Sequence, residues 1–146
     1  MRVFLEQLVN GLTIGSFYGL IALGYSMVYG VLKLINFAHG DFFALGSYLG
    51  YTLLVFGSAV WTTHLGPWAG MLAAMAAAAL CLALVGVLVE RAAYRPIYPA
   101  GRLPAVVSAL GASIIIQNLI MLIWGPRYQA YPAQLIPTLR LQVGAF

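Results

Sequence analysis

Residues 36–41 carry the sequence Asn36-Phe37-Ala38-His39-Gly40-Asp41, a polar hexapeptide that separates two uncharged runs, residues 7–32 and 42–63. Each run is long enough to cross a bilayer as a helix that rises about 1.5 Å per residue. In hydrocarbon, a carboxylate or imidazole is costly unless it is paired or hydrated, and every backbone polar group needs a partner. The hexapeptide is therefore predicted to lie at a membrane interface or to line a cavity walled by protein.

The amino-acid composition indicates whether the chain is surrounded by water or by lipid. Hydrophobic residues make up 63% of the 146 residues and charged residues only 7%, which is too little polar surface for a water-soluble globule. The net charge of +4 comes from residues at the ends of apolar runs, where they set membrane topology, so no nucleic-acid partner is expected. The chain is predicted to be an integral membrane protein in contact with a lipid bilayer.

The order of the apolar runs predicts the fold class. We expect an all-α polytopic helical bundle with about four transmembrane helices, at residues 7–32, 42–63, 69–89 and 105–124. A turn around Gly66-Pro67 separates the second and third runs, and Pro96, Pro99 and Pro104 are expected to prevent helix continuation before the fourth. The second run starts at a glycine-containing break, so it either spans fully or is discontinuous or re-entrant.

Positive charges in the connections predict the orientation. The connection at residues 90–104 contains three arginines, whereas the connection between the second and third runs contains none, so residues 90–104 are expected to form a cytoplasmic loop. The segment at residues 125–146 is then a periplasmic loop. With four full crossings the N-terminus is outside, and a re-entrant second run would reverse it. The residues singled out in the cytoplasmic loop are Glu90, Arg91, Tyr94 and Arg95.

Small residues recur at four-residue spacing in the first two runs. This spacing places them on one helical face and lets two backbones approach closely, so a helix-packing role is favoured over ligand contact. The residues predicted to pack in this way are Gly11, Gly15, Gly19, Ser26, Gly30, Gly46 and Gly50.

Polar side chains within the apolar runs are the candidates for a substrate path. They are Asn36, His39 and Asp41 in the hexapeptide and Ser108, Gln117 and Asn118 in the fourth run, where Ser113 also stands four residues before Gln117. The alternatives remain open: interhelical hydrogen bonds for the fourth run, and a helix cap for Asp41. His39 and Asp41 lack a nearby third ligand, so no metal site is expected. The sequence contains no catalytic motif, and neither enzyme activity nor a cofactor is expected.

Several motifs together carry a family resemblance. Residues 10–32 read Asn-Gly-Leu-Thr-Ile-Gly-Ser-Phe-Tyr-Gly at their start, and the hexapeptide and Leu45-Gly46-Ser47-Tyr48 follow. Residues 89–96 and 108–118 continue the pattern in order. The chain resembles the N-terminal half of the LivH-type permeases, membrane subunits of bacterial ABC importers for branched-chain amino acids, with related members handling other amino acids, short amides or urea.

The resemblance implies a division of labour among subunits. A LivH-type permease is expected to pair with a LivM-like second permease, to sit on two cytoplasmic ATPase subunits that hydrolyse ATP, and to receive substrate from a periplasmic substrate-binding protein. The expected location is the bacterial inner membrane, where the protein is multi-pass. Since family members are about twice as long, this chain is expected to be either the N-terminal part of a longer permease or a truncated copy.

Two other classes of function remain as alternatives. A secondary transporter or channel subunit for small polar solutes also has helices that break within the membrane, but the four runs show no convincing internal repeat. A non-transporting scaffold subunit would need only the small-residue faces. Copurifying ATPase and permease chains would favour the ABC importer, and proton- or sodium-dependent uptake would favour the secondary transporter.

Overall fold

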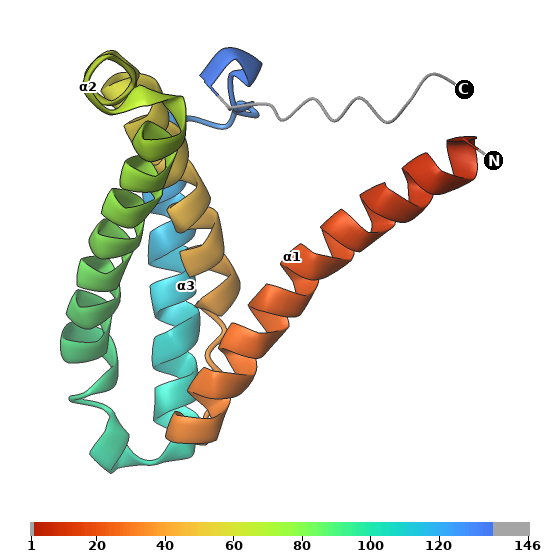
Figure 1. Cartoon of the computed structure of the whole chain (residues 1–146). Helices are drawn as coiled ribbons and strands as arrows, with labels where there is room; N and C mark the ends of the chain where they lie inside the picture. Colours follow the sequence, from red (N-terminus) through yellow and green to blue (C-terminus); the bar gives the residue numbers. More distant parts are fainter. Residues whose placement is uncertain (1, 136–146) are drawn as a thin grey trace. The chain divides into compact units, whose positions relative to one another are not determined.

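The structure, a computed structural model, describes residues 2–135, without the side chains at positions 2, 32, 59, 61–63 and 65. Its regular elements are all helical, which confirms the all-α class (Figure 1). The described residues contain three long helices and three short π or 3-10 segments. They are α1 (Arg2–Leu32), α2 (His39–Val89), η1 (Glu90–Tyr94), η2 (Tyr98–Ala100), α3 (Arg102–Trp124) and η3 (Ala133–Leu135). Two of the short segments lie between α2 and α3.

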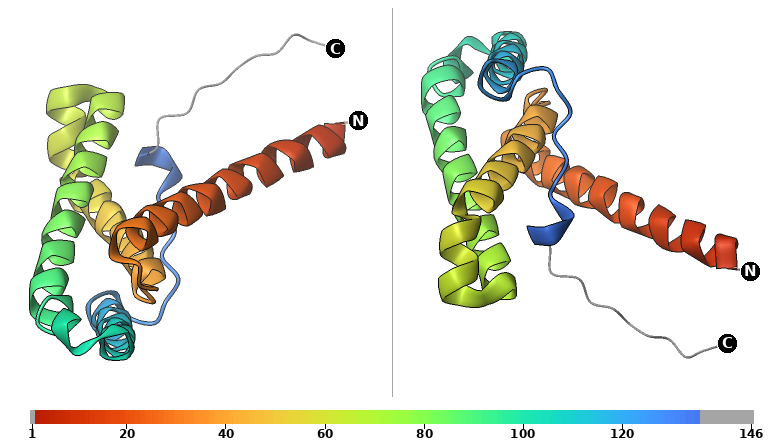
Figure 2. Two further views of the ribbon diagram at one scale, coloured as in Figure 1. Left: turned by 90° about the horizontal axis from the view of Figure 1, so that it is seen from below. Right: turned by 90° about the horizontal axis from the view of Figure 1, so that it is seen from above.

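Helix α2 consists of two arms joined at Gly66. The backbone of Gly66 has φ 78° and ψ 167°, a conformation that only glycine adopts without strain. Pro67 follows, and its ring is tolerated there because the first N–H groups of a helix have no helical partner. The two arms fold back on each other (Figures 1 and 2), so the expected turn between the second and third runs is present, and the described residues form four long helical segments.

The chain forms two compact units. The first contains the chain up to residue 43 together with residues 89–117, and the second contains residues 44–88 and the chain from residue 118 onward. The hexapeptide therefore belongs to the same unit as η1 and most of α3.

The core of the first unit is built on one face of α3. Small side chains dominate this face, so neighbouring segments can approach it closely. By contrast, residues 3–20 of α1 are exposed along their whole length, and this part of the helix projects away from the rest of the unit (Figures 1 and 2). The buried residues of the α3 face are Ala105, Ala109, Ala112, Ser113 and Ile116, and Ala38 and Tyr94 are buried in the same unit.

The second unit holds the two arms of α2 and the end of α3. A Cβ atom built on Gly46 would lie 3.0 Å from Leu82 Cδ2, so the two arms approach closely there. The indole Nε1 of Trp124 donates a hydrogen bond of 2.7 Å to Thr52 Oγ1, which links α3 to the first arm. These contacts show that the small residues of α2 face other segments of the same unit.

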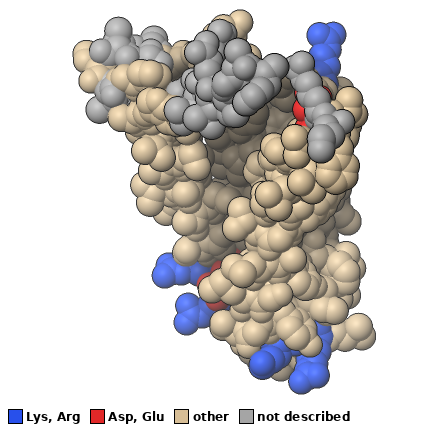
Figure 3. Space-filling view, turned by 45° about the vertical axis from the view of Figure 1, so that its right-hand side comes forward, with Lys and Arg blue, Asp and Glu red and all other residues tan. Residues whose placement is uncertain are grey.

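Three helical segments within the described residues are long and apolar enough to cross a membrane: Val3–Val31, Gly66–Tyr94 and Arg102–Trp124. The first arm of α2 is helical from His39 to the bend without an internal break, and its full crossing or re-entry stays a prediction. Most of the surface seen in Figure 3 is neither acidic nor basic, as expected for a protein in contact with lipid.

The connection at residues 90–104 contains more helix than the sequence indicated. Glu90–Tyr94 continues α2 as a π-helical turn, and α3 already begins at Arg102. Pro104 therefore lies in the first turn of α3 rather than in the connection, and the helix that ends at Tyr94 does not continue into α3. Proline is tolerated there because the N–H groups of the first turn need no helical partner. Residues 136–146 of the predicted periplasmic loop and the side chain of Trp61 lie outside the described part of the chain.

Candidate functional site around the hexapeptide

Asn36 joins the hexapeptide to the connection that follows α2. Its side-chain Oδ1 accepts two hydrogen bonds, one of 3.1 Å from the backbone N–H of Ala38 and one of 2.9 Å from the Tyr94 hydroxyl. The first bond forms a local turn of the kind that asparagine favours. The second is made by a buried tyrosine on η1, and π-helical turns of this kind are frequent at functional sites.

His39 is the first residue of α2, and its ring lies against α1. Its Nε2 is 3.3 Å from the backbone carbonyl oxygen of Ile21. A carbonyl can only accept, so Nε2 carries the proton and donates this bond. The ring also meets Tyr25 edge-on, with centroids 5.7 Å apart and an interplanar angle of 73°. The imidazole is thereby held in one orientation by two contacts from α1.

Gly24 makes the close approach of His39 to α1 feasible. A Cβ atom at this position would lie 3.3 Å from both Cε1 and Nε2 of the His39 ring, which is tighter than ordinary van der Waals contact. Sequence reasoning did not select Gly24, because it stands outside the four-residue series formed by Gly11, Gly15 and Gly19. A single glycine in an apolar run has no sequence signal that distinguishes it from its neighbours.

Asp41 is linked to α3 by two side-chain hydrogen bonds. Ser113 Oγ donates to its Oδ2 at 2.5 Å, and Gln117 Nε2 donates to its Oδ1 at 2.9 Å. Gln117 Nε2 also contacts Ser113 Oγ at 3.2 Å, which closes a three-residue network. Bonds to a carboxylate are stronger than those between neutral groups, and they satisfy a charge that hydrocarbon would otherwise penalise.

The structure does not support the helix cap that was one alternative for Asp41. Asp41 lies within the first turn of α2, and both of its carboxylate oxygens bond to α3. Its negative charge still lies near the positive end of the helix dipole. Ser113 was not among the path candidates, although its spacing from Gln117 placed the two side chains next to each other.

The remaining predicted residues occupy separate places. Ser108 Oγ donates a 2.6 Å hydrogen bond to the backbone oxygen of Ala93, so it ties α3 to η1. Asn118 is exposed on α3 and belongs to the second unit. Glu90 is half-buried, and Arg91 and Arg95 are exposed. No described atom would lie within 4 Å of a Cβ atom at Gly11, Gly15, Gly19 or Gly30, whereas Gly50 would meet Tyr131 Oη at 3.1 Å, and Ser26 bonds to the carbonyl of Ala22.

A groove of about 590 Å³ lies between the end of α1 and the hexapeptide. Its volume falls within the range of roughly 300–1,000 Å³ that small-molecule sites occupy. Asn36 and His39 contribute polar groups to its wall, and the rest is mainly apolar or aromatic. The other principal residues of the wall are Tyr18, Ile21, Tyr25, Ser26, Ile35 and Phe37.

The fold and this site together define a polytopic, all-α integral membrane protein with a polar network at its first helix break. Residues 7–139 match the family described as the permease component of branched-chain amino acid transport systems. The chain belongs to this family. The match confirms the family that the sequence motifs resembled.

The names of individual proteins similar to this chain agree with its family. The chain is 42% identical over 132 residues to the high-affinity branched-chain amino acid transport system permease protein BraD of Pseudomonas aeruginosa. It is 41% identical over 131 residues to the permease protein LivH of Escherichia coli K12 and 40% identical to LivH of Salmonella typhimurium. These matches cover 89–90% of this chain but 42% of each relative. No solved structure matches the chain.

The comparisons also bear on the location and class of the protein. Membership of the permease family, together with three helices apolar enough to span, confirms a multi-pass protein of the bacterial inner membrane. The relatives are named as permease proteins of branched-chain amino acid transport systems, and these names give no support to the secondary transporter or channel alternative.

Proposed function

We propose that this chain is part of the transmembrane permease subunit of a bacterial ABC importer that moves branched-chain or related amino acids across the inner membrane. The observation that supports this most strongly is the similarity to BraD and LivH over about nine-tenths of the chain. The chain spans 42% of the length of these relatives.

The proposed partners follow from the proposal that the chain is part of an ABC importer. A LivM-like second permease subunit completes the membrane pathway, and two cytoplasmic ATPase subunits supply the energy. A periplasmic substrate-binding protein delivers the amino acid. In this arrangement residues 90–104 lie on the cytoplasmic side, residues 125–146 on the periplasmic side, and the permease performs no chemical step.

Within the first unit, we assign contact with the substrate to Asn36 and His39. Both residues line the groove between α1 and the hexapeptide. A zwitterionic amino acid needs a few polar groups for its charges and an apolar wall for its side chain, and this groove offers both. The orientation of His39 by Ile21 and Tyr25 leaves the ring fixed, so it presents a constant surface to the path.

We assign a positioning role to Asp41 and Gln117. Their side chains bond to each other and to Ser113, so they hold the start of α2 against α3. Ser108 holds η1 in a similar way through the carbonyl of Ala93. Asn118 remains a candidate for the path on the exposed side of α3.

The proposal is tested by leucine uptake into proteoliposomes that contain the complete permease complex with its ATPases and binding protein. We expect ATP-dependent uptake, and we expect His39→Ala to reduce the initial rate several-fold without lowering the amount of complex in the membrane. His64→Ala is the matched control, because His64 is an exposed histidine away from the groove.

Two results would contradict the proposal. Uptake that follows a proton or sodium gradient without the ATPases would identify a secondary transporter instead. Normal uptake by both His39→Ala and Asp41→Ala, at normal membrane levels, would remove the hexapeptide from the substrate path.

A further inference from the structure

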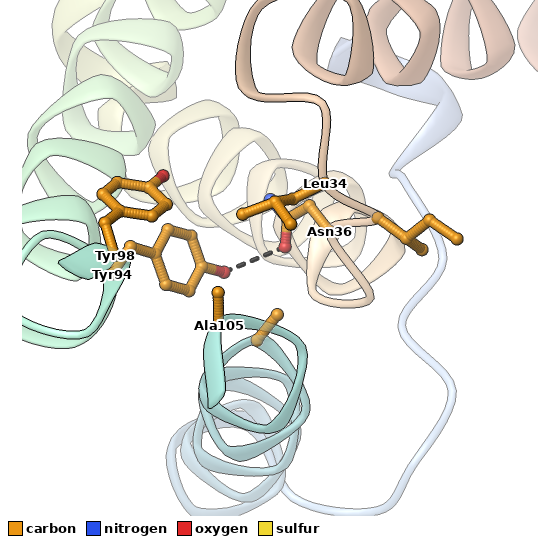
Figure 4. A pocket seen from close by; sticks show the side chains of 7 residues that line it. Leu34, Asn36, Tyr94, Tyr98 and Ala105 are labelled. Atoms are coloured by element: carbon orange, nitrogen blue, oxygen red, sulfur yellow. Dashed lines mark hydrogen bonds between the residues drawn. The ribbon is translucent and has the colours of Figure 1, made fainter. Parts of the chain in front are cut away.

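A small cavity of about 20 Å³ lies within the first unit, between the hexapeptide and the segments around η1 and η2. Figure 4 shows that its wall combines tyrosine side chains from one side with Asn36 from another and alanines of α3 below. Its wall includes Asn36, Tyr94, Tyr98, Ala105 and Ala109. The groove described above is separate from this cavity, although Asn36 contributes to both.

One polar atom at this cavity lacks a partner. The Tyr98 hydroxyl is buried, and no group among the described residues forms a hydrogen bond with it. Burial, followed by the negative charge of Glu90, raises the pKa of the Tyr98 phenol above its usual value. The hydroxyl is therefore neutral at physiological pH and can both donate and accept a hydrogen bond.

The neighbouring polar groups have spare hydrogen-bonding capacity. Asn36 Oδ1 already accepts from Ala38 and Tyr94, which leaves the amide hydrogens on its Nδ2 as donors. The Tyr94 hydroxyl donates its proton to Asn36 and keeps a lone pair that can accept. The wall of the cavity thus offers a donor, an acceptor and a hydroxyl that can serve as either.

We propose that this cavity binds one ordered water molecule, which hydrogen-bonds to the Tyr98 hydroxyl and bridges it to the Asn36–Tyr94 pair. A cavity needs roughly 10–15 Å³ to admit a water, and a buried water makes 2–4 hydrogen bonds to polar groups that would otherwise be unsatisfied. The volume of about 20 Å³ is enough for one such molecule.

The water adds a second link between the hexapeptide and the connection after α2. The direct link is the hydrogen bond from Tyr94 to Asn36. A bridging water is nearly as favourable as a direct hydrogen bond, and it lets Tyr98 take part in the same network. The two links together fix how η1 and η2 sit against the start of α2 within this unit.

Radiolytic hydroxyl labelling of the complete permease complex, followed by mass spectrometry, tests for the water. Radicals formed from a bound water modify the side chains beside it even when these are buried. After normalisation to the intrinsic reactivity of each side chain with hydroxyl radicals, we expect Tyr94 to be labelled several-fold faster than Ile116, a buried residue of the same unit that does not line the cavity. Tyr128, which is 92% exposed, gives the upper reference rate.

Ala109→Val provides the matched variant, because its added methyl groups fill the cavity from α3. We expect this substitution to lower the labelling of Tyr94 and Tyr98 at least threefold while leaving Tyr128 unchanged. Labelling of Tyr94 and Tyr98 in the unmodified complex at the rate of Ile116 would overturn the proposal, whether or not the variant assembles.

Thermal unfolding of Tyr98→Phe is an independent test. A cavity that holds water and a cavity that is empty predict opposite changes in the unfolding midpoint of this variant. If the hydroxyl is bonded to water, its removal lowers the midpoint of thermal unfolding of the complex; if the cavity is dry, removing an unsatisfied hydroxyl raises it. We expect the midpoint to fall, and Tyr128→Phe to leave it unchanged. A rise with Tyr98→Phe would overturn the proposal.

Discussion

The two ends of α1 differ although their sequences are alike. Residues 3–20 are exposed, and no described atom would lie within 4 Å of a Cβ atom at Gly11, Gly15 or Gly19. Toward the C-terminal end, Gly24 lies against the His39 ring, and Ile21 accepts its hydrogen bond. Small residues at regular spacing therefore indicate where another segment can approach α1 closely. Polar contacts determine where such an approach occurs in this chain.

The largest expected effect concerns the polar network of Asp41, Ser113 and Gln117. This network lies next to His39, which contacts the C-terminal end of α1. Asp41→Ala removes the acceptor for Ser113 and Gln117. We expect a loss of roughly 2 kcal/mol in the free energy of unfolding, because two hydrogen bonds to a carboxylate disappear. Thermal unfolding of the purified permease complex in detergent measures it.

Asp41→Asn is the control for this change, since it keeps the size and one acceptor oxygen while removing the charge. We expect it to be less destabilising than Asp41→Ala. Equal stability of Asp41→Ala and the unmodified complex would show that packing alone holds the C-terminal end of α1 in place.

A pair of glycine substitutions tests the difference between the two ends of α1 directly. Gly24→Ala places a methyl group 3.3 Å from the His39 ring, whereas Gly19→Ala meets open space. Alanine favours a helix over glycine by about 1 kcal/mol, and overpacking costs roughly 1–3 kcal/mol. We expect Gly24→Ala to be at least about 1 kcal/mol less stable than Gly19→Ala in the same unfolding measurement. Equal values for the two variants would contradict the close contact at Gly24.

Lys33 directly follows the last residue of α1 and has the backbone conformation with which this helix ends. Its φ of 54° is the one positive value among the described non-glycine residues, and its N–H donates to the Tyr29 carbonyl at 2.8 Å. Glycine adopts this conformation without strain, so we expect Lys33→Gly to stabilise the protein by about 0.5–1 kcal/mol. Lys33→Ala removes the charge but keeps the strain. If both variants gain equally in thermal unfolding, the gain comes from the charge.

The smallest effect on the unfolding of this chain is expected in the exposed part of α1. Gly15→Leu meets no described atom within 4 Å, so we expect its unfolding free energy to change by only a few tenths of a kcal/mol. We still expect it to lower the yield of the assembled permease complex in gel filtration, because a bulky side chain would separate helices that the small residues bring together. An unchanged yield would indicate that this face contacts lipid.

Much of the fold could be predicted, because membrane helices follow simple physical rules. The apolar runs mark helices, since backbone groups in hydrocarbon must bond within their own segment. The bend at Gly66-Pro67 was visible because proline and a positive-φ glycine end a helix. The π-helical turn at Glu90–Tyr94 was not predicted, because one extra residue in a helical turn leaves no compositional signal.

The candidate site was predictable only in part. Polar residues in apolar runs drew attention to Asn36, His39 and Asp41, and the structure gives each of them a specific contact in the first unit. Gly24 was missed, and Ser113 was noted only for its spacing from Gln117. Both matter through residues that are distant in sequence.

By itself, the sequence determined that this protein is an all-α membrane protein of the permease family, and it indicated where its helices break. These properties depend on composition, on helical length and on residues that restrict the backbone, all of which are local. Only the tertiary structure decided that Asp41 meets Ser113 and Gln117 and that Tyr94 meets Asn36. Hydrogen bonds require atoms within about 3 Å, and no local pattern specifies which residues, many positions apart, reach that distance.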